Sequence, residues 1–188
     1  MKPETRFDSK VIVRRGEQCD AELLAELGAR TFSETFAADN TPENMTDYLA
    51  SAFTPTKQAA ELADPQCLFL IAETNKDVLA GTDRVAVGYA LLRSERVPDG
   101  VSDDQPIELV RLYVARESIG CGIGAALMQA CIGEAQQLGY QTLWLGVWEN
   151  NPRAQEFYRQ WNFHEVGTHV FQLGDDPQTD LLMQRSLF

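Results

Sequence analysis

The feature that most constrains this chain is a glycine-rich segment between an apolar strand and an apolar helix. Residues 116–126 read RESIGCGIGAA, with glycine at 120, 122 and 124 followed by two alanines. Each glycine costs conformational entropy on folding, so three in alternation indicate that something comes very close to the backbone. The run IELVRLYV before it predicts a strand at 107–114, and the apolar residues after it predict a helix over about 124–138.

A strand, a glycine turn and a helix in this order are typical of an anion-binding site, because the first helical amides have no intrahelical partner and the helix dipole favours phosphate. A P-loop is rejected, since it needs Lys and then Ser or Thr where Ala125 and Ala126 stand. A dinucleotide fingerprint fits Gly120, Gly122 and Ala125, with the acidic Glu149 beyond the next strand, but too little chain remains for repeated βαβ units. A tight turn without a ligand and a pyrophosphate loop for coenzyme A are the other two interpretations.

The sequence as a whole, residues 1–188, predicts a single α/β domain. The order of its elements favours a mixed, mostly antiparallel β-sheet flanked by helices on both faces. The other predicted strands cover 11–15, 67–74, 85–93, 142–148, 164–173 and 181–187, and the other predicted helices begin at Asp20 and cover about 41–53, 56–63 and 152–162.

Composition narrows the function classes. The chain has 16 basic and 28 acidic residues, a formal charge of -12, which argues against a nucleic-acid partner and is compatible with a cationic one or with solubility alone. The sequence lacks an apolar run of membrane-spanning length and a signal-peptide core, and its four cysteines show no CxxC spacing. We expect a cytoplasmic protein without a membrane partner. A homodimer is one candidate assembly. No metal site is expected, since His164 and His169 lack a third ligand at metal spacing.

Four stretches resemble known acetyltransferases. LYVARESIGCGIGAALM resembles the strand, loop and helix of the GNAT N-acetyltransferases, and LWLGVWENNPRAQEFYRQWNF resembles their second motif, which ends in the pattern N-x-x-A-x-x-F-Y-x-x-x-G-F. ETFAADNTPENMTDYLASAF and LGDDPQTDLLM further resemble the PaiA-type polyamine N-acetyltransferases of that superfamily. Two positions differ from the usual residues of the GNAT motifs. Ile119 replaces the usual Gln or Arg, and Asn162 replaces a helix-ending glycine whose left-handed conformation asparagine also tolerates.

The resemblance implies an acetyl-CoA-binding core over about 107–163 and acceptor-side helices over about 20–63. The backbone of Leu112 and Val114 would pair with the pantetheine arm like an added strand, and the glycine loop would hold the pyrophosphate. Asn151 would bond the pantetheine from the other side, and a plain helix N-cap is its alternative role. The cofactor-binding residues implied in this way are Leu112, Tyr113, Val114, Ile119, Gly120, Cys121, Gly122, Ile123, Gly124, Ala125, Asn151 and Tyr158.

The implied chemistry is attack of an amine on a thioester. An alkyl amine with a pKa of about 10.4 is mostly protonated at neutral pH, so a group must take its proton. Glu108 is the only acid in an apolar strand and is the candidate base, directly or through a water. A salt bridge with Arg111, or a strand end facing water, is the alternative. Tyr158 stands where the superfamily places the general acid for the leaving thiolate, and core packing is its alternative role.

The acceptor pocket is expected beneath the helices over 20–53. Glu34, Asp39, Glu43 and Asp47 are the acids there that could attract a polycation, although exposed helical acids are usually only a solvated face. We therefore expect an N-acetyltransferase that transfers acetyl from acetyl-CoA to a primary amine, with a polyamine such as spermidine or spermine as the leading acceptor. The alternatives are a protein or peptide amine or an amino sugar as acceptor, a non-catalytic CoA-binding sensor and, more remotely, a nicotinamide oxidoreductase.

Overall fold

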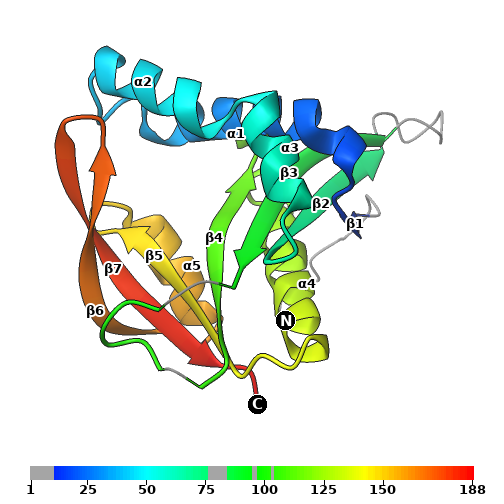
Figure 1. Ribbon diagram of the computed structural model, residues 1–188, viewed down its shortest axis with the longest axis vertical. Coiled ribbons are helices and arrows are strands. Elements are labelled where there is room, and N and C mark those ends of the chain that lie inside the picture. Colours follow the sequence, from blue (N-terminus) through cyan, green and yellow to red (C-terminus); the bar gives the residue numbers. More distant parts are fainter. Residues whose placement is uncertain (1–10, 76–83, 95–96, 103) are drawn as a thin grey trace, which may run out of the picture.

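A seven-stranded sheet runs through the molecule in the order β1-β2-β3-β4-β5-β7-β6 (Figure 1). The computed structural model describes residues 11–75, 84–94, 97–102 and 104–188. The strands are β1 (Ile12–Arg15), β2 (Cys67–Asn75), β3 (Arg84–Arg93), β4 (Pro106–Val114), β5 (Thr142–Trp148), β6 (His164–Leu173) and β7 (Asp176–Ser186). The helices are α1 (Ala21–Phe36), α2 (Pro42–Ala52), α3 (Pro55–Ala63), α4 (Ile123–Gln137) and α5 (Pro152–Gln160), with short 3-10 turns η1 (Gln18–Asp20) and η2 (Arg116–Ser118).

The predicted mixed sheet is confirmed. Neighbouring strands pair antiparallel, except that β4 and β5 pair parallel. The predicted start of the last strand at Leu181 was wrong, because β7 already begins at Asp176, directly after a two-residue turn at Gly174 and Asp175. Gly174 has a φ of +59°, the backbone that such tight hairpin turns require. The start of the chain and residues 76–83 lie outside the described residues.

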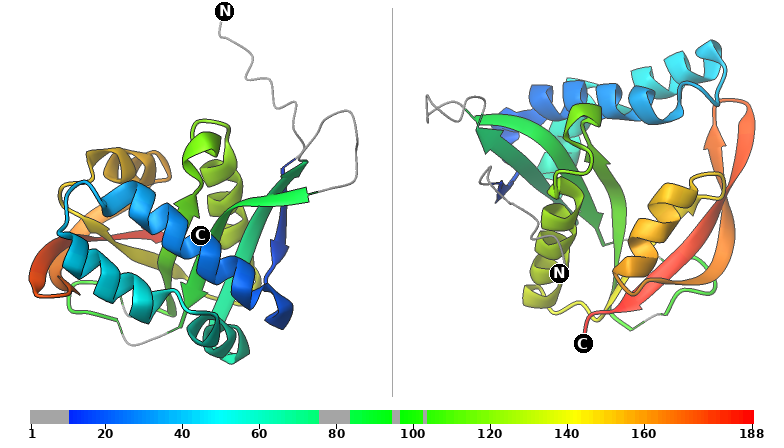
Figure 2. Two further views of the ribbon diagram at one scale, coloured as in Figure 1. Left: turned by 90° about the horizontal axis from the view of Figure 1, so that it is seen from above. Right: turned by 180° about the vertical axis from the view of Figure 1, so that it is seen from behind.

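Helices cover both faces of the sheet (Figure 2). On one face, α4 and α5 pack over a core that includes the fully buried Leu127 and Met128 of α4 and Leu143 and Leu145 of β5. On the other face, α1 packs Leu24 and other apolar side chains against β2 and β3. The alternation of side chains along each strand therefore assigns every strand residue to an α4–α5 face or an α1 face.

The helix ends follow from local sequence. Thr41 accepts a hydrogen bond from the amide of Asn44 and precedes a proline in the first turn of α2. Thr54 begins α3 in the same way. Such a cap followed by proline is a strong start signal for a helix. After α5, Asn162 has a φ of +62°, which confirms that asparagine takes the left-handed position expected of it.

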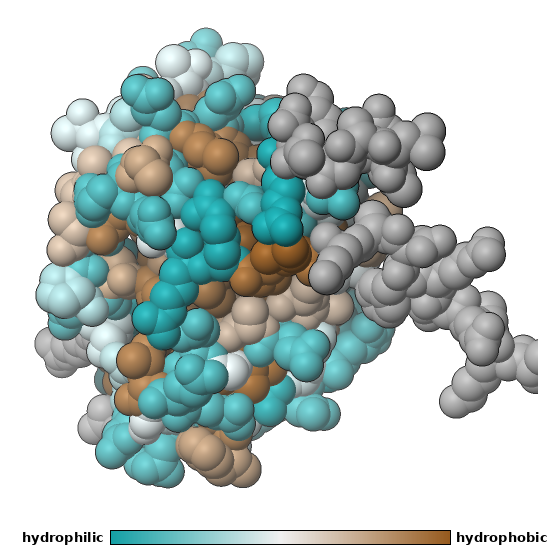
Figure 3. Space-filling model, turned by 90° about the vertical axis from the view of Figure 1, so that its right-hand side faces the viewer, coloured by the Kyte–Doolittle hydropathy of each residue, from teal (hydrophilic) through white to brown (hydrophobic). Residues whose placement is uncertain are grey.

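Charged side chains protect the exposed edge of the sheet at β1. Arg14 binds Asp20 and Glu73 at 2.7 and 2.8 Å, and Arg15 reaches Glu134 of α4 at 2.5 Å. Figure 3, which views the right-hand side of Figure 1, shows hydrophilic side chains in a band between apolar patches. An edge strand carrying arginines resists pairing with a second sheet.

Candidate active site

The centre of the sheet contains a parallel strand pair that separates along its length (Figure 1). β4 and β5 pair only through Pro106 with Thr142, Ile107 with Leu143 and Glu108 with Trp144. Beyond Glu108, β4 continues to pair with β3, and beyond Trp144, β5 continues to pair with β7. The facing edges of the two strands therefore diverge in the middle of the sheet.

The backbone of β4 presents hydrogen-bonding groups toward this opening. The amide of Ala115 donates to Val87 of β3 at 2.8 Å. Because these groups alternate sides along an antiparallel pair, the N–H and C=O of Val114 and Leu112 point to the opposite edge. An extended ligand with amide groups can pair there as an added strand. The side chain of Tyr113 instead faces away, toward aromatic residues beneath α1.

The glycine turn leads from this edge of β4 into α4. Gly120 and Gly122 have φ values of +86° and +82°, so both positions need glycine for conformational reasons. Gly122 is the N-cap, and the first intrahelical bond runs from Ala126 N to Gly122 O at 3.0 Å. The amides of Gly122 and of the next three residues, Ile123, Gly124 and Ala125, thus precede the intrahelical ladder at the positive end of the helix dipole.

The backbone torsion that explains Gly120 and Gly122 does not explain the third glycine, Gly124. A Cβ at Gly124 would lie 3.6 Å from the Phe157 ring and 3.9 Å from Val114, both ordinary contacts. The protein's own packing therefore does not require glycine at 124, unlike at Gly120 and Gly122. Ile119 and Cys121 are exposed beside the turn, whereas Ile123 is buried. The turn, the helix start and the open β4 edge together fit a pyrophosphate joined to an amide-containing arm.

Helix α5 carries two of the predicted site residues, Asn151 as its N-cap and Tyr158 within the helix. Asn151 caps α5, its Oδ1 accepting the Ala154 amide at 3.1 Å. This is the alternative role expected of it, and it uses only the side-chain oxygen, so the amide nitrogen stays compatible with a pantetheine contact. Tyr158 is half-buried against the core of the α4–α5 face. Burial, with a smaller contribution from Cys131, raises the pKa of Tyr158 well above its usual value.

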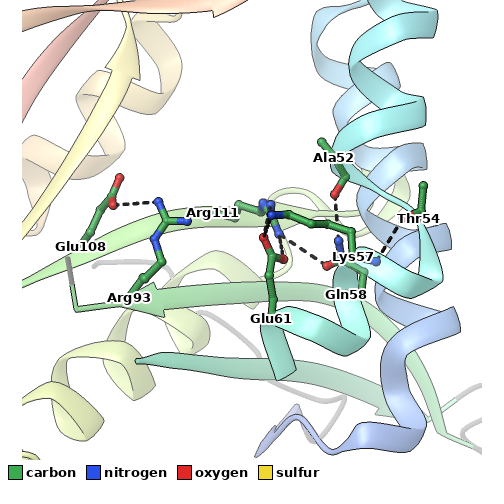
Figure 4. Close-up of polar contacts among 8 residues, drawn as sticks. All are labelled: Ala52, Thr54, Lys57, Gln58, Glu61, Arg93, Glu108 and Arg111. Atoms are coloured by element: carbon green, nitrogen blue, oxygen red, sulfur yellow. Dashed lines mark hydrogen bonds and ion pairs between the residues drawn. The ribbon is translucent and has the colours of Figure 1, made fainter. Parts of the chain in front are cut away.

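Glu108 has a charged neighbour in the structure. Arg93 of β3 lies opposite it in register, and Arg93 Nη2 is 3.4 Å from Glu108 Oε2 (Figure 4). The alternative partner expected from sequence, Arg111, binds Glu61 of α3 instead, at 2.8 and 3.1 Å. Glu108 therefore lies in a paired, mostly buried environment at the point where β4 and β5 begin to separate.

The acids expected to attract a polycation lie on or beside α1 and α2. Glu34 accepts a hydrogen bond from the backbone amide of Arg116 at 3.0 Å, which ties α1 to the turn after β4. Glu43 and Asp47 are exposed on α2, while Met45 of that helix is buried among aromatic side chains. Asp39 is exposed beyond the end of α1.

One carboxylate that the sequence analysis does not name lies on the β5–β7 side of the opening. Asp180 of β7 faces His169 of β6, with 3.5 Å between Oδ2 and Nε2, beside Gly146 of β5. The available signal was the turn at Gly174 and Asp175, whose two-residue length fixes the register that places these two residues opposite each other.

Within the described ranges, no three His, Cys, Asp or Glu side chains cluster as metal ligands would. No helix in those ranges has the length and apolar character needed to cross a membrane.

Comparisons with known proteins identify the family of this chain. The Acetyltransferase (GNAT) family profile matches residues 29–163. An uncharacterised N-acetyltransferase of Lactobacillus delbrueckii subsp. lactis is 31% identical over 94% of this chain and 96% of its own length.

Solved structures show the same fold. The PaiA N-acetyltransferase from Thermoplasma acidophilum in complex with coenzyme A gives a TM-score of 0.70 at 20% identity, covering 94% of this chain and 99% of that one. YncA from Salmonella typhimurium with its cofactor acetyl-CoA gives 0.65 at 21% identity, covering 96% and 95%. With the family match spanning most of the chain, this protein belongs to the GNAT family of acetyltransferases.

Proposed function

We propose that this protein transfers the acetyl group of acetyl-CoA to a primary amine, and that the preferred acceptor is a polyamine such as spermidine or spermine. Membership of the GNAT family makes it an acetyl-CoA-dependent N-acetyltransferase. The observation that carries the proposal is the separation of β4 from β5, which exposes the backbone of Leu112 and Val114 directly before the start of α4.

In the proposed binding mode, the outward backbone groups of Leu112 and Val114 hold the pantetheine amides. The amides of Gly122 to Ala125 receive the pyrophosphate, which needs no side chain and so tolerates Ile119 in place of Gln or Arg. The bound acetyl-CoA supplies the thioester carbon that the amine attacks. Asn151, the N-cap of α5, would donate its side-chain N–H groups to the pantetheine from the other side, and the proposal is compatible with its cap, which uses only the side-chain oxygen.

Two side chains would move the protons. Glu108, where the strands begin to separate, takes a proton from the incoming ammonium, directly or through a water, so that the nitrogen gains its lone pair. Tyr158 returns a proton to the departing thiolate. The raised pKa of Tyr158 keeps its hydroxyl protonated at neutral pH, which is the state that a proton donor needs.

The acceptor preference rests on charge and shape. The formal charge of -12 attracts polycations. Aromatic side chains, including Phe36, Tyr48 and Trp148, gather on the α1 face of the sheet beside the diverging strands, where they can pack against the alkyl segments of an amine. The free thiols of all four cysteines are compatible with a cytoplasmic enzyme.

An amine panel tests the proposal. Purified protein is incubated with acetyl-CoA and spermidine, spermine, putrescine, butylamine, an amino sugar or a peptide with a free N-terminus. CoA release is followed together with product mass. We expect the polyamines to give the highest kcat/KM, with one acetyl group added per CoA released. Binding of acetyl-CoA without any product would indicate a non-catalytic CoA sensor, and a preference for the peptide or sugar would reject the polyamine assignment.

A further inference from the structure

Glu108 and Asp180 share one face of the sheet. Glu108 pairs with Trp144 of β5, and Asp180 pairs with Trp148 of the same strand and with His169 of β6. Paired residues, and every second residue along a strand, point to the same face. This is the α1 face, since Phe36 of α1 packs edge-on against Trp148 with 6.0 Å between ring centroids.

Gly146 leaves room for the His169–Asp180 pair. A Cβ at Gly146 would lie 3.2 Å from Asp180 Oδ2 and 3.2 Å from His169 Nε2, tighter than ordinary contacts. The carboxylate and the imidazole therefore lie over the backbone of β5 rather than beyond the sheet. This places an acidic group two residues along β5 from Trp144, the partner of Glu108.

The pair lacks a permanent cation. Among the described residues, no Lys or Arg forms an ion pair with Asp180, although its side chain is only 15% exposed. His169 Nε2 is buried, and its contact with Asp180 Oδ2 at 3.5 Å is longer than a normal hydrogen bond but close enough for the imidazole to position the carboxylate. Burial raises the pKa of Asp180, and His169 offsets part of this effect. A buried carboxylate in this state is stabilised by an incoming cation.

The spacing from Glu108 suits a second nitrogen. Two residues along a strand span about 6.6 Å and neighbouring strands lie about 4.8 Å apart, so the positions of Glu108 and Gly146 are roughly 8 Å apart. An alkyl chain of about three or four carbons with a nitrogen at each end, hydrogen-bonded at both, reaches roughly 11 Å between the acceptor oxygens. Two carboxylates that extend from backbone positions roughly 8 Å apart can open to this separation. Tyr48, whose pKa is raised by burial with a smaller contribution from charges that include Asp180, adds an aromatic side chain near this carboxylate.

We propose that Asp180, oriented by His169, binds a second ammonium group of the acceptor while the first amine is acetylated. This inference rests on the proposed function and adds the residue that distinguishes diamines and polyamines from monoamines. The reacting ammonium loses one proton to Glu108 and attacks the thioester carbon, so that a C–N bond forms and the C–S bond breaks. Tyr158 gives its proton to the departing thiolate, and the second proton lost by the nitrogen returns to Tyr158. The second ammonium keeps its proton and its charge throughout, so Asp180 is a specificity residue and takes no part in the chemistry.

Steady-state kinetics with matched amines tests the role of Asp180. For Asp180→Asn we expect kcat/KM for putrescine and spermidine to fall roughly 10- to 100-fold, mainly through KM, because a charge-assisted bond is lost. Activity on butylamine should change less than about threefold. His169→Gln should also lower kcat/KM for putrescine and spermidine more than for butylamine. The loss should be smaller than in Asp180→Asn, since the carboxylate remains and is only held less firmly. Glu165→Gln, an exposed acid on β6, removes the same charge and should not alter the preference.

The outcomes separate this inference from the proposed function. An equal loss on butylamine and putrescine, or an unchanged preference in Asp180→Asn, would overturn the second-ammonium role. If the wild type acetylates none of the amines, the proposed function fails, and calorimetric titration of spermidine into the CoA-bound protein then decides. Binding that Asp180→Asn weakens supports the subsite, whereas absent or unchanged binding rejects it.

Discussion

Replacing Glu61 by glutamine tests how β4 is held beneath the acceptor-side helices. Glu61 of α3 forms a bidentate ion pair with Arg111 of β4 at 2.8 and 3.1 Å, and the two side chains are 8% and 9% exposed (Figure 4). Arg111 also lies 5.3 Å from the centroid of the Phe53 ring. Burial alone would lower the pKa of Arg111, but the bonds to Glu61 outweigh it and raise the pKa. The arginine therefore stays charged and depends on the carboxylate.

The magnitude follows from what remains after the substitution. Removing one partner of a buried ion pair costs about 3–5 kcal/mol, because the other charge is left uncompensated. Gln58 Oε1 lies 3.4 Å from Arg111 Nη1 and can still accept a hydrogen bond, so the lower end of that range applies. We expect Glu61→Gln to lower the free energy of unfolding by about 3 kcal/mol. For a chain of this length the melting temperature then falls by about 6–12 °C.

Urea unfolding followed by tryptophan fluorescence measures this loss. The control is Glu117→Gln, which breaks an exposed pair with Arg30 at 3.2 Å, where the side chains are 61% and 44% exposed. Exposed pairs contribute less than about 1 kcal/mol. Adding Arg111→Met to Glu61→Gln should recover part of the loss, since no buried charge is then left unpaired. Equal effects of Glu61→Gln and Glu117→Gln would refute the reasoning.

The remaining predictions concern the site. Gly124→Ala should weaken acetyl-CoA binding by calorimetry without lowering the melting temperature, and Gly133→Ala, at an open position of the same helix, should leave binding unchanged. Tyr158→Phe should lower kcat roughly 10²-fold with little change in acetyl-CoA affinity, and a loss under threefold would place the proton transfer elsewhere. Asp180→Asn should raise the melting temperature of the free enzyme at neutral pH. The raised pKa of Asp180 means that the native state binds more protons than the unfolded state, so stability falls as pH rises through that pKa. The gain should therefore disappear in acid, and a pH-independent difference would contradict this cause.

Local sequence was sufficient to predict the elements around the proposed acetyl-CoA site, namely β4, the glycine turn, α4 and α5. The glycines at 120 and 122, the cap at Asn151 and the left-handed Asn162 act within a few residues of their own position, so pattern and conformational preference predict them. The same signals predicted the strand that presents Leu112 and Val114. Only the reason for each glycine needed coordinates, because backbone torsion and packing at Gly124 are not visible in the sequence.

The acceptor side depended on long-range pairing. Glu61 and Arg111 meet across fifty residues, and β7 lies between β5 and β6 although it comes last in the chain. Neither arrangement leaves a local pattern. The sequence analysis therefore names acids on the predicted helices and does not name Asp180, whose position near β5 follows only from the hairpin register and the strand order.

Residue-resolved amide hydrogen exchange, with and without acetyl-CoA, tests the central claim most directly. If the β4 edge and the start of α4 bind acetyl-CoA, the amides of Leu112, Val114 and Gly122 to Ala125 will gain protection, because each acquires an acceptor on the ligand. Amides of the exposed β1 edge will not change. Protection elsewhere, with these six amides exchanging as before, would contradict the account.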